Sequence, residues 1–442
     1  MPATSSNLAV SPHETASSFA ELGVPSALAA ALAARGITTP RPIQAHTLPD
    51  GLAGRDVLGR AETGSGKTLA FGLPMLIRTA TAGGGRLARR PRGLVVVPTR
   101  ELADQVHDEL HPLAALLDLR LLTVYGGVSA QRQIQALRRG IDIVVATPGR
   151  LQDLVRQGAC SLDAVDIAVL DEADHMADMG FLPDVRRLLD MTPATTQRML
   201  FSATLDGAVG QVVRDYLSDP VARAVDDAES HVSTMEHRAL VVSLQHKVDV
   251  LGEILARPAR TLLFVRTKHG ADRLVKQLGR IGVHAQAIHG NRTQGQRQRA
   301  LDAFSSGHSR VLVATDVAAR GIHVPDVDLV IHADPPNDHK DYLHRSGRTA
   351  RAGANGVVVS VLAPDQVRPA QRLFDRAGVQ VAPVPAGPGS EEVRELAESG
   401  EVVVVTAAPV RERSERSSGQ ARTRRPSRHR GAPSPSGRSR RP

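Results

Sequence analysis

Short runs of apolar, mostly β-branched residues alternate with longer stretches of helical periodicity along the first half of the chain. The apolar runs lie at residues 94–97, 141–145 and 167–170, and the helical stretches at 99–117 and 148–157. Such runs are typical of buried strands, and strands that alternate with helices form βαβ units. The pattern therefore predicts an α/β domain with a parallel sheet and helices on both of its faces.

The same alternation starts again after a polar, non-periodic segment at residues 226–233, which indicates a linker and a second α/β domain. The apolar runs of this second part lie at 261–265, 285–288, 311–313 and 327–331. We expect, in chain order, a disordered N-terminal segment (1–18), a first domain (19–224), a linker (225–232), a second domain (233–383) and a low-complexity, Arg-rich tail (384–442). Within that tail, residues 391–405 have the pattern of a short helix followed by a strand.

The composition supports a folded protein rather than a disordered or membrane-spanning one. The chain has 442 residues, of which 41% are hydrophobic and 23% charged, and these values are ordinary for globular domains. Its apolar runs are far shorter than the roughly 18 residues of a membrane helix, so we expect no membrane partner. Residues 1–18 lack the pattern of a secretory signal. Cys160 is the single cysteine, so no intrachain disulfide can form, and we expect its small side chain to be buried. The lack of disulfides fits a reducing compartment, and we expect the protein in a bacterial cytoplasm.

The formal charge of +9 comes from the end of the chain. Residues 409–442 hold eleven Arg against two Glu, which gives 11 − 2 = +9 and leaves the first 408 residues formally neutral. The charge thus predicts either a solubilising tail or a nucleic-acid-binding arm, and says little about the folded part. Residues 79–92, with three consecutive Gly and four Arg, are expected to form a basic surface loop.

A phosphate-binding loop is predicted where a short apolar run at residues 57–58 is followed by a Gly-rich segment and a helix. The segment reads Ala-Glu-Thr-Gly-Ser-Gly-Lys-Thr, with Ala61 where the usual pattern has Gly. Its backbone N–H groups can surround phosphate oxygens, while Lys67 meets the β- and γ-phosphates and Thr68 can ligate Mg²⁺. The candidate loop residues are Ala61, Glu62, Thr63, Gly64, Ser65, Gly66, Lys67 and Thr68. A Gly-rich turn without a ligand is the alternative.

An acidic run, Asp-Glu-Ala-Asp at residues 171–174, directly follows the apolar run at 167–170. Such a run on a helix is most often a solvated face. Its position at a strand end, about a hundred residues beyond the Gly-rich loop, favours a catalytic role. Asp171 can hold the hydration shell of Mg²⁺, and Glu172 can position or deprotonate a water molecule in line with a γ-phosphate. Together with the loop, this predicts phosphoryl transfer to water.

A basic cluster in the second half, at residues 344–351, can complete this chemistry. Arg348 and Arg351 are three residues apart, so they share one face of a helix. A basic surface patch is the alternative. Arginines that stabilise the transition state of phosphoryl transfer contribute roughly 10³ to 10⁵ in rate. Because both lie in the domain opposite Lys67, we expect catalysis to require that the two domains close over the nucleotide.

Taken together, residues 19–360 resemble the DEAD-box family of ATP-dependent RNA helicases, which is named after the one-letter code of the tetrapeptide at 171–174. About ten short motifs occur in the family's order: Phe19 with 36–44 (similar to the family's adenine-reading Q motif), the loop at 61–68, 98–102, 126–127, 147–150, 171–174, 202–204, 264–267, 289–297, 315–321 and 344–351. Each is weak by itself, but their joint order makes coincidence negligible. The resemblance implies two tandem RecA-like parallel-sheet domains, followed by the disordered basic tail, and RNA-stimulated ATP hydrolysis that unwinds or remodels short duplexes.

The resemblance also implies residue roles. Ile37 and Gln44 would contact adenine, and Ser202 and Thr204 would link the nucleotide state to the domain arrangement. RNA would be bound without regard to sequence along a path lined by Thr99, Arg100, Gly127, Thr147, Gly149, Arg150, Thr267, Gln294, Arg297 and Thr315. Cofactors would be ATP and Mg²⁺. We further expect a monomer whose partners are RNA and ribosomal or mRNA-decay proteins.

Besides Ala61, residues 37, 41, 323, 346 and 350 depart from the family pattern; Ser346 and Ala350, which replace a usual Ile and Gly, leave both candidate arginines in place. Ile37 replaces an aromatic ring that stacks on adenine, which predicts weak ATP affinity; Arg41 replaces a Thr, and His323 an acid associated with the ribose. Two other functions are compatible with the motifs. One is an ATP-gated clamp that holds partners on RNA, and the other is a DNA translocase, which the Q-motif match and the lack of accessory modules disfavour.

Overall fold

The structure is a computed structural model that describes residues 18–61, 64–83, 85–205, 207–225, 235–319, 327–350 and 356–400. Most of the expected N-terminal segment and linker lie outside the described residues, as does the tail from residue 401. The same is true of the candidate site residues Glu62, Thr63 and Arg351, and of His323. None of the described helices has the length and apolarity that a bilayer crossing requires.

The first domain is built on a seven-stranded sheet in the order β3-β4-β2-β5-β6-β1-β7, in which all neighbours pair in parallel. Its strands are β1 (Val57–Arg60), β2 (Gly93–Val96), β3 (Leu121–Val124), β4 (Ile143–Ala146), β5 (Ile167–Asp171), β6 (Gln197–Ser202) and β7 (Val221–Ala224). The three apolar runs predicted as strands are β2, β4 and β5. Because successive side chains point to opposite faces of a strand, the inner strands contribute to a core on each face.

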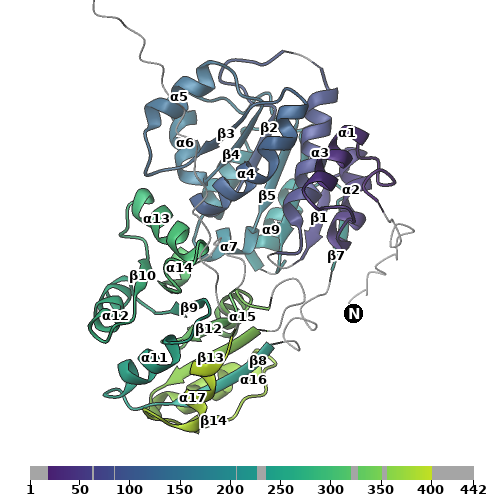
Figure 1. Cartoon of the computed structure of the whole chain (residues 1–442). Helices are drawn as coiled ribbons and strands as arrows, with labels where there is room; N and C mark the ends of the chain where they lie inside the picture. The colour runs from purple at the N-terminus through teal and green to yellow at the C-terminus, as the bar shows by residue number, and fades with distance from the viewer. Residues whose placement is uncertain are drawn as a thin grey trace, which may run out of the picture. The chain divides into compact units, whose positions relative to one another are not determined.

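Helices cover both faces of this sheet (Figure 1). One face packs against α1 (Ser26–Ala34), α2 (Pro42–Leu52), α3 (Lys67–Thr81) and α4 (Arg100–Leu116). The other packs against α5 (Ala130–Arg138), α6 (Pro148–Arg156), α7 (Ala173–Asp178), α8 (Leu182–Leu189) and α9 (Gly207–Tyr216). On β2, Val95 belongs to the first core and Leu94 to the second, and Cys160 is buried in the second, as expected.

The second domain repeats this plan in a seven-stranded parallel sheet with the order β10-β11-β9-β12-β13-β8-β14. Its strands are β8 (Met235–Val241), β9 (Thr261–Phe264), β10 (Ala285–Ile288), β11 (Val311–Ala314), β12 (Leu329–His332), β13 (Gly356–Leu362) and β14 (Pro383–Pro385). If β3 is matched to β10 and β1 to β8, the two sheets have the same strand order. The predicted fold of two tandem parallel-sheet α/β domains is therefore confirmed.

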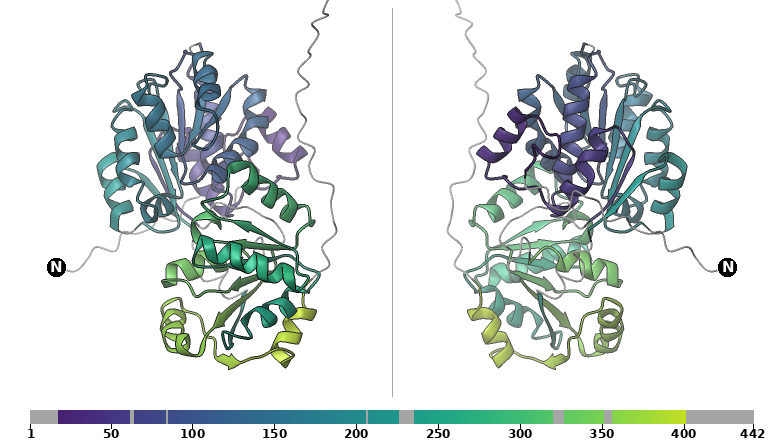
Figure 2. Two further views of the ribbon diagram at one scale, coloured as in Figure 1. Left: turned by 90° about the vertical axis from the view of Figure 1, so that its left-hand side faces the viewer. Right: turned by 90° about the vertical axis from the view of Figure 1, so that its right-hand side faces the viewer.

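The helices of the second domain also form two layers, which Figure 2 shows from the sides. One core contains residues of α11 (Lys247–Leu255), α12 (Lys268–Arg280) and α17 (Glu391–Glu398). The other contains residues of α13 (Gln294–Ser305), α14 (Asp316–Ala319), α15 (His339–Ser346) and α16 (Val367–Arg376), which follows the 3₁₀ turn η2 (Pro364–Gln366).

The structure changes two expectations, one about where the C-terminal tail starts and one about the basic segment 79–92. The second domain continues past residue 383, because β14 pairs with β8 and Val393 and Leu396 of α17 are buried in the core. The tail therefore starts later than the pattern of Pro, Gly and Arg suggested. The basic segment 79–92 is also not simply a solvated loop: Arg86 Nε and Arg92 Nη2 pair with the two carboxylate oxygens of buried Asp142, at 2.7 and 3.0 Å.

Candidate functional site

The Gly-rich loop lies between β1 and α3, and its backbone conformation requires glycine. Gly64 and Gly66 have φ angles of 93° and 94°, in the left-handed region that side chains rarely adopt. A Cβ atom on Gly66 would come within 2.5 Å of Gln44 Nε2, so there is no room for one. The loop and α2 therefore pack against each other through a glycine, which brings Gln44 to the edge of the loop.

Lys67, the first residue of α3, pairs with Glu172 in the interior of the first domain. Its Nζ atom donates to Glu172 Oε1 at 2.9 Å and to the carbonyl oxygen of Ala61 at 3.1 Å. Burial by itself would lower the pKa of Lys67, but the carboxylates of Glu172, Asp171 and Asp174 outweigh it and raise that pKa above its usual value. The ammonium group therefore stays charged at the base of the Gly-rich loop.

Asp171 ends β5, and Glu172 turns the chain into α7 with a φ of 56°. Burial is the main cause that raises the pKa of Asp171 to about 7; Lys67 opposes this rise and the neighbouring carboxylate of Glu172 adds to it. Three carboxylates thus face one ammonium group. This excess of buried negative charge fits a hard divalent cation, and Thr68 and Asp171 carry oxygen atoms of the kind that Mg²⁺ prefers as ligands.

A cavity of about 440 Å³ opens beside these residues. Ile37, Gln44, Gly64, Gly66, Lys67, Thr68, Asp171 and Glu172 are among the residues that line it, so the structure brings together most of the predicted nucleotide-binding set. Gln44 Oε1 accepts from the backbone N–H of Arg41 at 2.9 Å, and its Nε2 donates to Gly66 O at 3.0 Å. Its amide is therefore held at the cavity wall by both the Q-motif backbone and the loop.

Arg41 and Glu109 were not predicted as cavity residues, and both line it. The Arg41 guanidinium donates to the carbonyl oxygen of Gly64, so the residue that departs from the family pattern touches the phosphate loop. Burial raises the pKa of Glu109, while a hydrogen bond from Thr68 and the charges of Arg35 and Arg41 oppose the rise. No sequence spacing could reveal Glu109, because it reaches the cavity from the third turn of α4.

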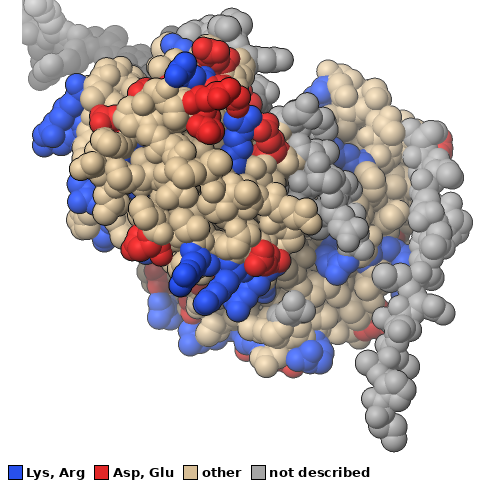
Figure 3. Space-filling model, turned by 90° about the horizontal axis from the view of Figure 1, so that it is seen from below, with Lys and Arg blue, Asp and Glu red and all other residues tan. Residues whose placement is uncertain are grey.

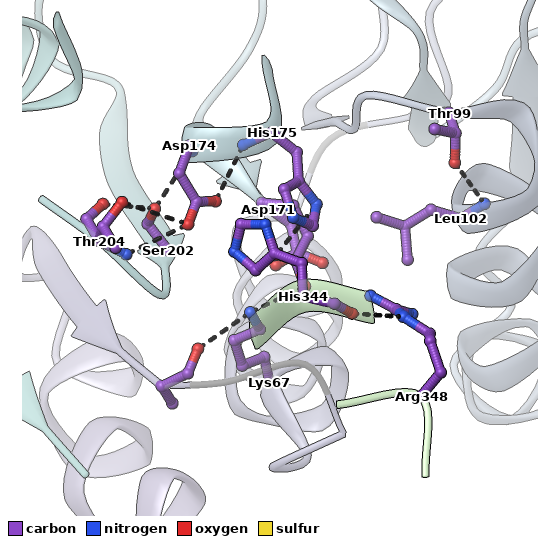
Figure 4. A network of polar contacts seen from close by, with 12 residues as sticks. Lys67, Thr99, Leu102, Asp171, Asp174, His175, Ser202, Thr204, His344 and Arg348 are labelled. Carbon is purple, nitrogen blue, oxygen red and sulfur yellow. Dashed lines mark hydrogen bonds and ion pairs between the residues drawn. The ribbon is translucent and has the colours of Figure 1, made fainter. Parts of the chain in front are cut away.

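Ser202 and Thr204 connect the end of β6 with the acidic motif (Figure 4). The Asp174 carboxylate accepts from the backbone N–H of Thr204 at 3.2 Å, and the Asp174 N–H donates to Ser202 Oγ at 3.2 Å. Ser202 Oγ in turn donates to Thr204 O at 2.7 Å. Because β6 lies between β5 and β1 in the sheet, a shift of the acidic motif would move this turn directly.

The second domain contributes α15, whose His344 contacts His175, the residue that follows the acidic motif. The ring of His344 lies edge-on to that of His175, with ring centroids 4.7 Å apart, and Arg348 lies close by in Figure 4. Arg348 is buried, and its Nε atom donates to His344 O at 3.3 Å. The position of Arg351, the second candidate finger, is outside the described residues. Among the described residues, Arg348 is therefore a candidate arginine that lies near this centre.

Arg345 positions this segment, a role that sequence reasoning missed. Its Nε and Nη2 atoms donate to the two carboxylate oxygens of Asp316 at 2.5 and 2.8 Å, and its Nη1 donates to Asp334 O at 2.7 Å. The side chain is almost fully buried. A bidentate pair of this kind fixes the end of α15, from which Arg348 follows after a single turn.

The predicted RNA contacts gather where helices begin at the carboxyl ends of parallel strands. Thr99 caps α4 after β2, Thr147 caps α6 after β4, and Thr267 caps α12 after β9. Thr315 directly precedes α14 after β11, and Gly149 lies in the first turn of α6. The N–H groups of helix N-termini favour phosphate, so these positions can hold a sugar-phosphate backbone without reading bases.

Arg100 and Arg150 lie beside the glycine pair at 126–127. A Cβ on Gly127 would come within 2.1 Å of Arg100 Nη1, so only glycine lets this guanidinium lie on the backbone. Gly127 also has a φ of 80°. Arg150 Nη1 donates to Gln133 Oε1 at 3.1 Å and to Val128 O at 3.3 Å. The structure therefore places Arg100, Gly127 and Arg150 together at the edge of the first sheet.

Gln294 and Arg297, which are predicted to line the RNA path, both contact Glu101. Arg297 Nη2 pairs with Glu101 Oε2 at 2.9 Å, and Gln294 Nε2 donates to Glu101 Oε1 at 3.2 Å. Glu101 belongs to the first domain, in the first turn of α4. Both side chains of α13 thus hold the residue next to Arg100, and their described contacts join the domains. The sequence did not predict a role for Glu101, because its partners Gln294 and Arg297 lie almost two hundred residues away along the chain.

Comparison with known proteins identifies the family. The DEAD/DEAH box helicase family matches residues 41–212, and the helicase conserved C-terminal domain matches residues 246–353. A maize protein described as "DEAD-box ATP-dependent RNA helicase 3B, chloroplastic" is 42% identical over 396 residues, which are 88% of this chain and 52% of that protein. The DEAD-box ATP-dependent RNA helicase CshA of Bacillus cereus is 39% identical over 348 residues, 78% of this chain and 65% of its own.

A solved structure is similar over almost its whole length. The structure described as S. cerevisiae Dbp5 bound to RNA and ADP BeF3 superposes with a TM-score of 0.76 at 30% identity, and it covers 86% of this chain and 99% of its own. The chain spans only about half to two thirds of the length of the curated relatives that it matches. The strand order, the cavity motifs and these matches agree, and the chain belongs to the DEAD-box helicase family.

Proposed function

We propose that this protein is an RNA-stimulated ATPase that uses ATP to unwind or remodel short RNA duplexes. The observation that carries the proposal is the arrangement of one centre from both domains. The buried Lys67–Glu172 pair lies at the base of the cavity, and His344, close to Arg348, contacts His175, which directly follows the acidic motif. The RNA and the ADP BeF3 named for the Dbp5 structure support the choice of ligands.

The residues of the cavity can divide the hydrolysis of ATP among them. Water would attack the γ-phosphorus and release ADP and phosphate, and the Glu172 carboxylate would orient the water and accept its proton. Lys67 would exchange its bond to Glu172 for the β- and γ-phosphates, which leaves that carboxylate available for the water. Thr68 and Asp171 would hold Mg²⁺, which when bound neutralises the charge on the phosphate oxygens.

Arg348 would stabilise the charge that develops during transfer of the phosphoryl group. Because this arginine belongs to the second domain, it acts only while the two domains are together. RNA bound at the helix N-termini of both domains would favour that arrangement and so stimulate hydrolysis. Glu101, held by Gln294 and Arg297, lies next to the predicted RNA contact Arg100, so the same segment of α4 can respond to RNA and to domain closure.

Unwinding would be local. A backbone held at several helix N-termini takes a path that a complementary strand need not follow, and each base-pair step is worth roughly 1.4 kcal/mol by the average for DNA. Loss of a few pairs therefore releases a short duplex but not a long one. After hydrolysis, loss of the γ-phosphate removes the ligand that Arg348 and Lys67 share, and the domains can separate.

The first test is the dependence of hydrolysis on nucleic acid. We expect steady-state ATP hydrolysis by the full chain to rise at least tenfold with single-stranded RNA and to change little with DNA of the same sequence. Equal stimulation by DNA would contradict RNA as the substrate and favour a translocase on DNA. Tight ATP-dependent RNA binding with negligible turnover would instead support the alternative, an ATP-gated RNA clamp.

A second prediction concerns base selectivity. Replacing Gln44 by alanine removes the amide that is held between Arg41 and Gly66 at the cavity wall. A hydrogen bond of this kind contributes about 0.5–1.5 kcal/mol, so the preference for ATP over GTP, measured as the ratio of kcat/KM, should fall up to about tenfold. His46→Ala on the same helix is the control, because His46 does not line the cavity. An unchanged ratio in Gln44→Ala would show that this amide does not read adenine.

The remaining predictions are independent of these tests. That the chain acts as a monomer, that ribosomal or mRNA-decay proteins are its partners, and that it is cytoplasmic stay predictions from the sequence. So do the weak ATP affinity expected from Ile37 and the RNA-binding arm expected at residues 409–442.

A further inference from the structure

One helix of the second domain presents a row of positive charge that the motifs do not explain. α12 buries Ala271, Leu274 and Leu278 in the core. At 100° per residue, His269, Arg273, Lys276 and Arg280 fall within about 60° of one another on the outward side, and all four are exposed. We call these four residues the α12 basic row. It spans roughly 16 Å at 1.5 Å per residue.

In the part of the chain that the structure describes, no ion pair neutralises the α12 basic row. The only acidic residue of the helix is Asp272, whose Oδ1 is held by His289 at 3.0 Å and by Arg292 at 2.6 Å. Among the described residues, no ion pair involves Arg273, Lys276 or Arg280, whereas arginines elsewhere on this domain, such as Arg238 and Arg257, pair with acids. Like charges one helix turn apart cost about 0.2–0.5 kcal/mol per pair, so the row is slightly unfavourable without a ligand.

Charge of one sign is not spread over the whole surface. On the face shown in Figure 3, Lys and Arg side chains lie in separate groups, with Asp and Glu and much uncharged surface between them. The helix α16 gives a direct comparison: it also exposes three arginines, Arg368, Arg372 and Arg376, one turn apart. There, however, Asp365 and Asp375 are close in sequence, and α16 packs on the opposite face of the sheet from α12.

The place of the α12 basic row in the fold suggests its ligand. The helix starts immediately after Thr267, a predicted RNA contact, whose Oγ1 accepts from Gly270 N–H at 3.0 Å. Lys268 in the first turn reaches across to Asn291 Oδ1 at 3.0 Å, toward the start of α13 and Gln294. A strand that passes Thr267 can therefore continue along the row, where cations spaced at one helix turn meet successive phosphates.

We propose that the α12 basic row binds the phosphate backbone of RNA that extends beyond the path between the two domains. The proposal rests on the proposed RNA-dependent function. It adds an extended, sequence-independent contact that anchors a flanking single strand while the core acts on a neighbouring duplex. If three phosphates are neutralised, each contributes about 0.7 to the dependence of log affinity on log salt, so the row contributes about 2.1.

The test compares the full chain with two triple variants, R273A/K276A/R280A on α12 and R368A/R372A/R376A on α16. Fluorescence anisotropy would measure binding, with a non-hydrolysable ATP analogue, of an RNA of roughly 8 nucleotides and of the same RNA extended by roughly 10 at either end. We expect the α12 variant to bind the short RNA normally and one extended RNA more weakly, with a salt slope flatter by about 2. The ratio of the wild-type affinity to the affinity of the α12 variant for that extended RNA should fall about eighteenfold between 50 and 200 mM salt.

Three outcomes would overturn the inference. Equal losses in both variants would mean that general positive charge, not this row, is responsible. Unchanged binding of both extended RNAs by the α12 variant would mean that RNA does not use the row, and would leave an acidic protein as the alternative ligand to test. A loss of affinity for the short RNA as well would mean that the row belongs to the RNA path between the two domains. If wild type binds neither RNA in an ATP-dependent manner, the proposed function itself fails.

Discussion

Replacing Arg348 by alanine should lower RNA-stimulated ATP turnover by roughly 10³-fold or more, because a transition-state arginine contributes about that much to phosphoryl transfer. Binding of ATP and of RNA should change little, since Arg348 contributes mainly when charge moves during the reaction. The measurement is kcat at saturating RNA together with the affinity for a non-hydrolysable ATP analogue. Arg348→Lys should recover little activity, because an ammonium group lacks the planar fork of donors.

Two further variants make this result specific. Arg372→Ala, which removes an exposed arginine from α16, should leave turnover within about twofold of wild type. Arg351→Ala separates the two candidate fingers, since both arginines were predicted and the position of Arg351 is outside the described residues. A loss in Arg351→Ala without one in Arg348→Ala would transfer the role to Arg351, and a decrease below tenfold in both would contradict a catalytic finger.

Sequence patterns predicted β2, β4 and β5 of the first sheet and β9, β10, β11 and β12 of the second, although β10 lies at a sheet edge and the central β13 was not predicted. β2, β4 and β5 consist mainly of Val, Ile, Leu and Ala because strands of a parallel sheet are buried on both faces. β6 was not predicted: it reads Gln-Arg-Met-Leu-Phe-Ser and has no β-branched residue, although its central position buries it. β14, Pro-Val-Pro, is an edge strand where proline costs no ladder hydrogen bond, and its sequence looks like a loop.

The site residues also fall into those that the sequence predicted and those that it did not. Residues that act through the local backbone, such as Gly66 beside Lys67 and Thr68, leave a spacing that the sequence displays. Residues that act through a distant partner do not. Arg345 holds Asp316 from a position 29 residues away, and Gln294 reaches Glu101 across 193 residues. Only packing of the second sheet and contact between the domains give these residues their roles.

The same reasoning identifies what His175 adds. The sequence predicts a metal-binding role for Asp171 and a water-positioning role for Glu172, but no role for His175, which follows the motif. In the structure His175 Nδ1 lies 3.6 Å from Glu172 Oε2, and its ring meets that of His344. Glu172, which we propose positions the attacking water, is therefore next to the side chain that contacts the second domain. This gives a short physical route from domain contact to the proposed catalytic carboxylate.

Replacing Glu172 by glutamine should separate hydrolysis from binding. The amide keeps the size of the side chain, and its oxygen can still accept from Lys67 Nζ, which now lies 2.9 Å from Glu172 Oε1. It cannot accept a proton from water, however, and a positioned general base contributes roughly 10²–10⁴-fold. We therefore expect RNA-stimulated kcat to fall by that factor, while ATP-dependent RNA binding stays as tight as in wild type or becomes longer-lived.

The matched control is Asp178→Asn, which removes an exposed carboxylate from the other end of the same short helix, α7. It should leave turnover almost unchanged. If Glu172→Gln hydrolyses ATP within tenfold of wild type, the buried carboxylate is only a partner of Lys67, and another group must activate the water. If the substitution abolishes nucleotide binding as well, the pair with Lys67 holds the loop together, and the loss of turnover says nothing about proton transfer. Binding without turnover is the result that assigns the base to Glu172.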